Sequence, residues 1–282
     1  MRSVAALLLL GLAAPAHAQL TVTYIANEGF LLEGGERKVL VDALFGPGIS
    51  PYPTIPPALR PALEGASPPF DDVDVVLATH HHADHFDAGT VARHLRANPG
   101  ARFISTPQAV DRLRRVAADD PGVLERLDAT LPPEGERRTV RHRGLDVVVL
   151  NLHHGRSRNP PVQNLGFLVV MGGVKWLHVG DTEVDEDDVR PYALPSEAIG
   201  VALLPTWFFG SERWVRVVER HIRPANVVVM HRVNERAPAS YYEPGASATS
   251  QTRRIRQRFP GAVIPGEPGE SKTFTRREGE GG

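Results

Sequence analysis

The sequence predicts an α/β protein, an αββα sandwich in which two face-to-face, mostly antiparallel β-sheets carry helices on their outer faces. Short apolar runs rich in β-branched residues, typical of buried strands, fall into two groups along the chain. Each group is followed by segments with helical periodicity that can cover one face of a sheet. No internal repeat, low-complexity tract or linker separates the two groups, so we predict a single domain over residues 19–282.

Residues 1–18 have the features of a secretory signal peptide. Arg2 gives a positive start, Val4 to Ala14 form an apolar run, and Ala-His-Ala at residues 16–18 is a small-x-small cleavage site. The apolar run is too short to span a membrane. We therefore expect cleavage before Gln19, a periplasmic or secreted protein, and no stable membrane anchor after cleavage. An uncleaved N-terminal anchor is the alternative.

The charge of the chain is balanced, with 32 basic and 33 acidic residues. This balance argues against a nucleic-acid-binding protein, so we expect a small-molecule substrate. The chain contains no cysteine, which excludes disulfides and a lipidated cysteine after the cleavage site. Any metal ligand must therefore be His, Asp or Glu.

The N-terminal part predicts an antiparallel meander of three strands, at residues 20–25, 30–33 and 38–42. Turn signals separate these strands, namely Asn27-Glu28-Gly29 and Gly34-Gly35. Residues 46–70 follow with eight prolines and little periodicity, which excludes a helix or a central strand. This Pro-rich segment is either a lid over a site or a plain connector.

Strand and helix patterns alternate after the Pro-rich segment, and a second run of strands follows. We expect strands at residues 74–78, 102–105, 138–143, 145–152, 164–170, 174–179, 201–204 and 226–230. We expect helices at residues 88–95, 107–117, 211–222 and 249–258. In the third of these helices, the spacing places four residues on one shared face: Trp214, Val217, Val218 and His221. The polar, glycine-rich tail over residues 276–282 should fray.

The most informative motif is Thr79-His80-His81-His82-Ala83-Asp84-His85, which holds four histidines and one carboxylate in seven residues. It directly follows the predicted strand at residues 74–78, so its side chains should lie on a loop with a rigid support. Borderline divalent metals such as zinc accept imidazole and carboxylate ligands. A solvated, histidine-rich loop is the alternative, but this spacing rarely arises by chance. The motif predicts a metal site.

Further candidate ligands stand at the ends of other predicted strands. His153 and His154 end the strand at residues 145–152, Gly180-Asp181 follows the strand at 174–179, and His231 follows the strand at 226–230. A two-metal hydrolytic site needs roughly six or seven ligands, more than the first motif supplies. Strand ends are where a fold gathers side chains from distant parts of the sequence.

Taken in order, His80-x-His82-x-Asp84-His85, His154, Gly180-Asp181 and His231 resemble the motifs of the metallo-β-lactamase superfamily of hydrolases. Residues 27–32, 38–42, 164–167 and 177–182 are similar to its ascorbate-phosphate lactonase-like branch, and the resemblance covers about residues 20–265. It implies a first metal held by His80, His82 and His154. It implies a second metal held by Asp84, His85 and His231. Asp181 would bridge both ions, and Asp84 and Asp181 would serve catalysis.

This resemblance implies a cofactor of two divalent ions, Zn²⁺ first, with Mn²⁺ or Fe²⁺ as alternatives. A water that bridges the ions would lose a proton near neutral pH and act as the nucleophile. We therefore expect an exported dinuclear hydrolase that attacks an ester, lactone, amide or phosphodiester bond. One alternative is a nuclease of the same superfamily, with a small basic patch formed by Arg253, Arg254, Arg256 and Arg258. Another is a non-catalytic metal-binding or ligand-binding module on the same fold. The sequence fixes neither substrate nor oligomeric state.

Some assignments remain open between a role at the site and a structural role. His153 and His154 alternate across a strand, so only one points inward, and the following Gly155 favours His154 because the family has a His-Gly turn there. His81 should point away from its neighbours. Asp42 either orients a ligating histidine or forms a turn or cap. His178 either supports a ligand or belongs to the core.

Three other features complete the set of candidates. Arg156 and Arg158 could grip a phosphate or carboxylate, or be solvated loop charges. The aromatic run at residues 206–209 either caps the core or walls a pocket. Three histidines have no supporting pattern and should be structural or at the surface: His94, His142 and His221.

Overall fold

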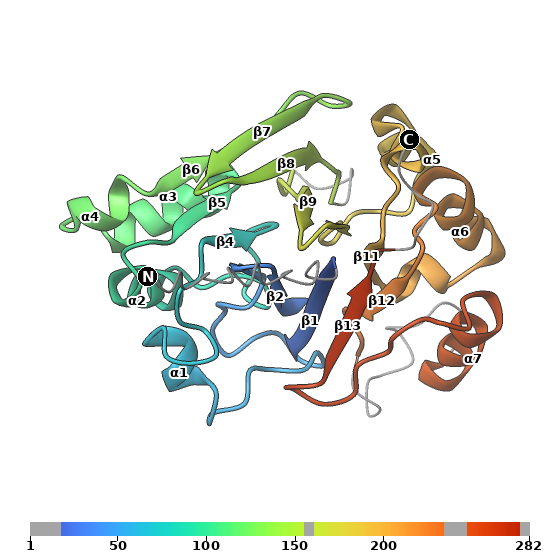
Figure 1. The fold of residues 1–282 in the computed structure, drawn as a ribbon, viewed down its shortest axis with the longest axis horizontal. Coiled ribbons are helices and arrows are strands. Elements are labelled where there is room, and N and C mark those ends of the chain that lie inside the picture. Colours follow the sequence, from blue (N-terminus) through green and yellow to red (C-terminus); the bar gives the residue numbers. More distant parts are fainter. Residues whose placement is uncertain (1–17, 155–160, 234–246, 277–282) are drawn as a thin grey trace, which may run out of the picture.

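The computed structural model describes residues 18–154, 161–233 and 247–276. Its strands form two sheets, of seven and six strands. Helices α1 to α4 lie on one side of the molecule and α5 to α7 on the other (Figure 1). The predicted αββα sandwich is confirmed, with both sheets mixed: among the pairings of described strands, six are antiparallel and five parallel.

The first sheet has the order β13-β1-β2-β3-β4-β5-β6. Its strands are β1 (Gln19–Ala26), β2 (Gly29–Gly34), β3 (Arg37–Val41), β4 (Val75–Ala78), β5 (Arg102–Ser105), β6 (Leu127–Ala129) and β13 (Ser271–Thr275). The predicted antiparallel meander is present as β1-β2-β3. Side chains alternate between two cores, so Val39 and Val41 face the second sheet while Leu40 packs under the helices.

The second sheet has the order β12-β11-β10-β9-β8-β7. Its strands are β7 (Arg137–His142), β8 (Leu145–Asn151), β9 (Leu165–Met171), β10 (Val174–His178), β11 (Val201–Pro205) and β12 (Val227–Met230). Every strand predicted in this half is present, with ends shifted by no more than about two residues. Phe167 and Trp176 are fully buried and fill the space between the sheets.

The outer face of the first sheet is covered by α1 (Arg60–Glu64), α2 (Ala88–Ala97), α3 (Pro107–Val116) and α4 (Pro121–Leu124). On the other side lie α5 (Glu186–Val189), α6 (Glu212–Val217) and α7 (Ala248–Arg258). Short helical segments complete this side. Three are 3₁₀-helical, η1 (Arg190–Tyr192), η2 (Leu194–Glu197) and η3 (Thr206–Phe209), and one is π-helical, η4 (Val218–Ile222). The long helices have side-chain caps, since Asp87 accepts from Thr90 N and Thr106 accepts from Ala109 N. Among the described residues, no helix is long and apolar enough to cross a bilayer.

The structure differs from two expectations about helices. The Pro-rich segment was expected to exclude a helix, but it contains the short α1. Pro61 stands in the first turn of α1, where a missing N–H breaks no helical hydrogen bond. The predicted single helix over residues 211–222 is α-helical only to Val217 and then widens into the π-helical η4.

The sequence also missed β6, β13, α4 and α5. The edge strand β13 pairs with β1 although it has a single buried side chain, Phe274. Polar edge strands avoid aggregation but lack the apolar pattern of a buried strand. The predicted signal peptide and the frayed tail fall outside the described residues, apart from Ala18 and Arg276.

The fold brings the predicted motifs to one edge of the sandwich. The His80–His85 loop follows β4, His154 follows β8, Asp181 follows β10, and His231 follows β12. Because these strands belong to two facing sheets, residues separated by about 150 positions in the sequence meet there.

Candidate metal centre

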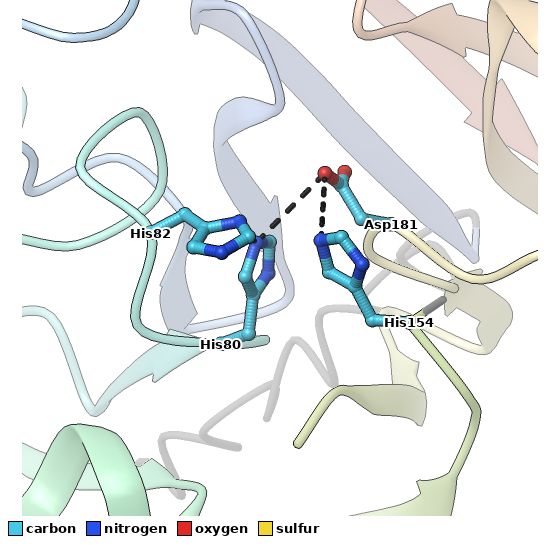
Figure 2. A group of neighbouring side chains, drawn as sticks. All are labelled: His80, His82, His154 and Asp181. Carbon is cyan, nitrogen blue, oxygen red and sulfur yellow. Dashed lines mark hydrogen bonds and ion pairs between the residues drawn. The ribbon is translucent and has the colours of Figure 1, made fainter. Parts of the chain in front are cut away.

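All seven predicted ligands lie together in two groups. The first group consists of His80, His82, His154 and Asp181. The second consists of Asp84, His85 and His231. Within each group, the potential ligand atoms lie within 4.8 Å of one another. Figure 2 shows the three imidazoles of the first group converging on Asp181. This division into two groups is the one that the family resemblance implies.

Asp181 lies between the two groups. Its Oδ2 is 3.4 Å from His154 Nε2 and 3.3 Å from His231 Nε2. Its Oδ1 is 3.4 Å from His85 Nε2. Two ligands placed about 2.1 Å from one tetrahedral zinc ion are about 3.4 Å apart. The separations therefore match those between ligands that share an ion.

The imidazole nitrogens at the centre fit metal ions. The Nε2 atoms of His85, His154 and His231 are buried, and none has a hydrogen-bond partner among the described residues. A buried polar atom without a partner is unfavourable, and a bound cation would satisfy each of these lone pairs. The residues present thus fit the metals that the superfamily implies.

Hydrogen bonds fix the tautomer of His80. The Thr79 hydroxyl donates to Asp42 Oδ2 at 2.7 Å, so its oxygen accepts from His80 Nδ1–H at 3.1 Å. The His80 Nε2 lone pair then faces the centre, 3.0 Å from His82 Nδ1. Burial lowers the pKa of His80 well below its usual value. Burial and His154 lower the pKa of His82 to about 3. Both rings are therefore neutral, the form that binds a metal.

Asp42 holds a second ligand in place directly. Its Oδ2 accepts from His85 Nδ1–H at 2.9 Å, which turns His85 Nε2 toward the centre. Its Oδ1 accepts from the backbone N–H of Thr79 at 2.7 Å. Of the two predicted roles of Asp42, the structure thus favours orientation of a histidine. One buried carboxylate supports a histidine in each group.

Asp181 and the neighbouring histidines shift one another's pKa values, because they lie close together. Burial alone would raise the pKa of Asp181, but His231 and His85 outweigh it and hold that pKa well below its usual value. Burial alone would lower the pKa of His85, but Asp181 and Asp42 hold it well above its usual value. Asp181 is therefore a largely buried carboxylate, 11% exposed, that needs positive charge beside it.

The turn before Asp181 requires a glycine. Gly180 has φ +58°, and a Cβ there would lie 2.3 Å from Asn164 Oδ1 and 2.7 Å from Thr79 Cβ. Asn164 Oδ1 in turn accepts from the backbone N–H of Asp181 at 3.2 Å. The Gly-Asp pair thus sets the position of the Asp181 carboxylate.

His153 points away from the centre. Its Nδ1 lies 2.6 Å from Asp188 Oδ1 and its Nε2 lies 2.7 Å from Glu134 Oε1. The geometry therefore favours His154 over His153 as the ligand. His81 belongs to neither group, in line with the expectation.

The remaining histidines have structural contacts. His94 and His142 bind the backbone oxygens of Leu63 and Gly100, and His221 lies 3.3 Å from Glu186. His178 is buried, and its two ring nitrogens hydrogen-bond to the backbone of Glu28 and Gly180.

The comparisons with known proteins agree with this geometry. The sequence pattern of the family described as "Beta-lactamase superfamily domain" matches residues 37–239. The chain belongs to this superfamily. The predicted membership and enzyme class, a metal-dependent hydrolase, are confirmed at that level.

Two sequence relatives support the same family, and one solved structure supports the fold. A UPF0173 metal-dependent hydrolase from Pyrococcus furiosus is 29% identical over 216 residues, covering 74% of this chain and 83% of the relative. Its counterpart from Pyrococcus abyssi is 30% identical over 216 residues with the same coverage. The structure of a metallo hydrolase from Ignicoccus hospitalis is 19% identical and covers 92% of this chain and 100% of its own, with a TM-score of 0.59. The closer resemblance to the ascorbate-phosphate lactonase-like branch stays a prediction.

A cavity of about 590 Å³ opens beside the centre. Its lining includes three of the predicted ligands, His154, Asp181 and His231, and also Tyr52, Trp207, Arg213 and Trp214. The ring centroids of Tyr52 and Trp207 lie 4.1 and 4.8 Å from that of His231. The Pro-rich segment thus contributes a wall of the cavity. Within the aromatic run, Trp207 walls the cavity while Phe208 and Phe209 are buried in the core. Arg156 and Arg158 lie outside the described residues.

Sequence reasoning missed two kinds of residue here. Nothing in the Pro-rich segment distinguishes Tyr52 from its neighbours. Trp214 could have been identified as a cavity residue, because it stands on the predicted shared face of the helix over residues 211–222. Glu28 was interpreted only as part of a turn, yet it is fully buried next to both Asp181 and His231. Burial and the nearby Asp181 raise the pKa of Glu28 well above its usual value.

Replacing His154 with alanine should abolish binding of one metal ion, because this removes an imidazole that faces Asp181. His153→Ala is the matched control, since that ring faces Asp188 and Glu134, and it should keep the metal content of the parent protein. Metal per chain, measured by elemental analysis after desalting, checks both variants. Loss of metal in His153→Ala alone would reverse the assignment.

Proposed function

We propose that the protein is a hydrolase with a dinuclear metal centre. His80, His82 and His154 hold the first ion, Asp84, His85 and His231 hold the second, and Asp181 bridges them. The observation that carries this proposal is the position of Asp181, whose two oxygens together contact imidazoles of both groups at 3.3 to 3.4 Å.

The donor set supports borderline divalent ions, with Zn²⁺ first and Mn²⁺ or Fe²⁺ as alternatives. When bound, such ions supply Lewis acidity that polarises a scissile bond and lowers the pKa of a water. The neutral imidazoles leave this Lewis acidity intact, while Asp84 and Asp181 offset part of the positive charge. Asp42 keeps His80 and His85 in the tautomers that point Nε2 at the ions.

The cavity supports a small-molecule substrate with an ester, lactone, amide or phosphodiester bond. Tyr52, Trp207 and Trp214 line it with aromatic rings, and Arg213 adds one cationic group to the lining. A nuclease is less well supported, because the predicted basic patch is partly engaged within the chain. Arg254 donates to the backbone oxygen of Phe209, and Arg258 pairs with Glu212 and Glu219.

Protein loaded with excess Zn²⁺ or Mn²⁺ and then desalted should retain two ions per chain. The same protein should hydrolyse at least one substrate class in a screen of lactones, β-lactams and phosphodiesters, with metal-stripped protein as control. One ion per chain at saturation would contradict the dinuclear centre. Turnover that survives metal removal would contradict the metal dependence.

Asp181→Asn should fold but bind the second ion weakly, because asparagine keeps the size of the side chain and loses its charge. We expect turnover to fall on the order of a hundredfold or more, the scale for loss of an electrostatic catalytic group. Asp187→Asn, an exposed acid six residues away, is the matched control. Two retained ions with unchanged turnover in Asp181→Asn would show that Asp181 only caps the Gly180 turn.

We propose in addition that residues 1–18 export the protein to the periplasm or the medium. The supporting pattern is the charged start, apolar run and small-x-small site of the N-terminus. The full chain expressed in a Gram-negative host should appear in the periplasmic fraction with Gln19 as first residue by mass spectrometry. Leu9→Arg, which interrupts the apolar run, should remain in the cytoplasm. A parent chain with an intact N-terminus would indicate the uncleaved anchor.

A further inference from the structure

Glu28 is a buried ionisable residue that the proposed seven ligands do not include. It lies in the turn between β1 and β2, and its side chain is 0% exposed. Neither Oε1 nor Oε2 has a hydrogen-bond partner among the described residues. A buried carboxyl group without a hydrogen-bond partner is unfavourable, so a bound group that contacts its oxygens, such as a cation, is expected.

The Glu28 side chain is aimed at the second group. Its ligand atom lies within 4.8 Å of those of Asp181 and His231, and the three residues together have the spacing of a metal site. Its Oε2 is also 3.5 Å from His85 Nδ1, the ring nitrogen that donates to Asp42. Three residues assigned to the second ion therefore surround this carboxyl group.

Hydrogen bonds tie the Glu28 turn to the loops that carry the ligands. His178 Nδ1 accepts from the backbone N–H of Gly180 at 3.1 Å, so its Nε2–H donates to the Glu28 backbone oxygen at 3.1 Å. The backbone N–H of His231 donates to the Asn27 oxygen at 3.3 Å. Asn27 Nδ2 also donates to Asp84 Oδ2 at 3.2 Å. The turn is thereby held against the loops of Asp84, Asp181 and His231, which fixes where its side chain can reach.

We infer that Glu28 is an additional ligand of the second metal ion. This inference rests on the proposed dinuclear centre and extends its ligand set. With Glu28, the second position has three carboxylates and two imidazoles, which exceeds the four ligands of a tetrahedral zinc site. Oxygen-rich sets of this size suit Mn²⁺ or Fe²⁺. The second position is thus selective for a harder ion than the first, where His80, His82 and His154 supply three nitrogens.

Glu28→Gln tests this role, because glutamine keeps the volume of the side chain and removes its charge. Competition with a chromophoric chelator should show second-site Mn²⁺ affinity lowered on the order of a hundredfold. Zn²⁺ affinity at the second site should fall less, and first-site affinity should not change. Asp74→Asn is the matched control, since Asp74 is also a buried acid but pairs with Arg37, and it should bind both ions as the parent does.

Crystals of the Mn²⁺-loaded parent protein provide a measurement that does not depend on the variant folding. Their anomalous map should place a Glu28 oxygen within about 2.5 Å of the second ion. A distance beyond about 3 Å, or unchanged second-site affinity in Glu28→Gln, would overturn the inference and leave the dinuclear centre intact. A parent protein that binds one ion would overturn both.

Discussion

The arrangement of the site depends on the two carboxylate oxygens of Asp181. One faces His85 and the other faces His154 and His231, so a single carboxylate contacts ligands of both groups. In a buried site, this charge is stable only with positive charge close by. His80 and His82 do not supply it, because their low pKa values keep both rings neutral. Two divalent ions would satisfy both the carboxylate and the unpartnered nitrogens.

The rest of the fold serves to hold this arrangement. Gly180 allows the close turn that places Asp181 against Asn164 and Thr79. Asp42 sets the tautomers of two histidines at once, directly for His85 and through Thr79 for His80. Such supports beneath metal ligands commonly determine metal affinity as strongly as some ligands do. The inter-sheet core, with Phe167 and Trp176 buried, keeps the strand ends that carry the ligands at a fixed separation.

Much of this could be predicted from the sequence, for physical reasons that differ between residues. The His-x-His-x-Asp-His pattern is dense enough to indicate a metal site alone, and buried strands with β-branched residues show clear periodicity. Asp181 and His231 became candidates because each follows such a strand, and the family resemblance then assigned their roles. His154 could be favoured over His153 only by that resemblance, since strand alternation has no direction of its own.

Other features could not be predicted, because they depend on contacts between distant segments. Glu28 stands in a turn, and turn residues are usually solvated, so its burial follows only from the meeting of two sheets. Tyr52 is one aromatic residue in a Pro-rich segment without periodicity. The strand β13 exists because β1 offers an edge, not because its own sequence is apolar. Local pattern carries no information about any of these contacts.

The central claim is that one centre holds two ions bridged by Asp181. Electron paramagnetic resonance of the protein loaded with Mn²⁺ at both positions tests it most directly, because ions about 3.5 to 4 Å apart with a shared carboxylate couple magnetically. The account predicts the hyperfine pattern of an exchange-coupled pair, lost when Asp181 is replaced by asparagine. A spectrum of isolated Mn²⁺ ions in the fully loaded parent protein would contradict it.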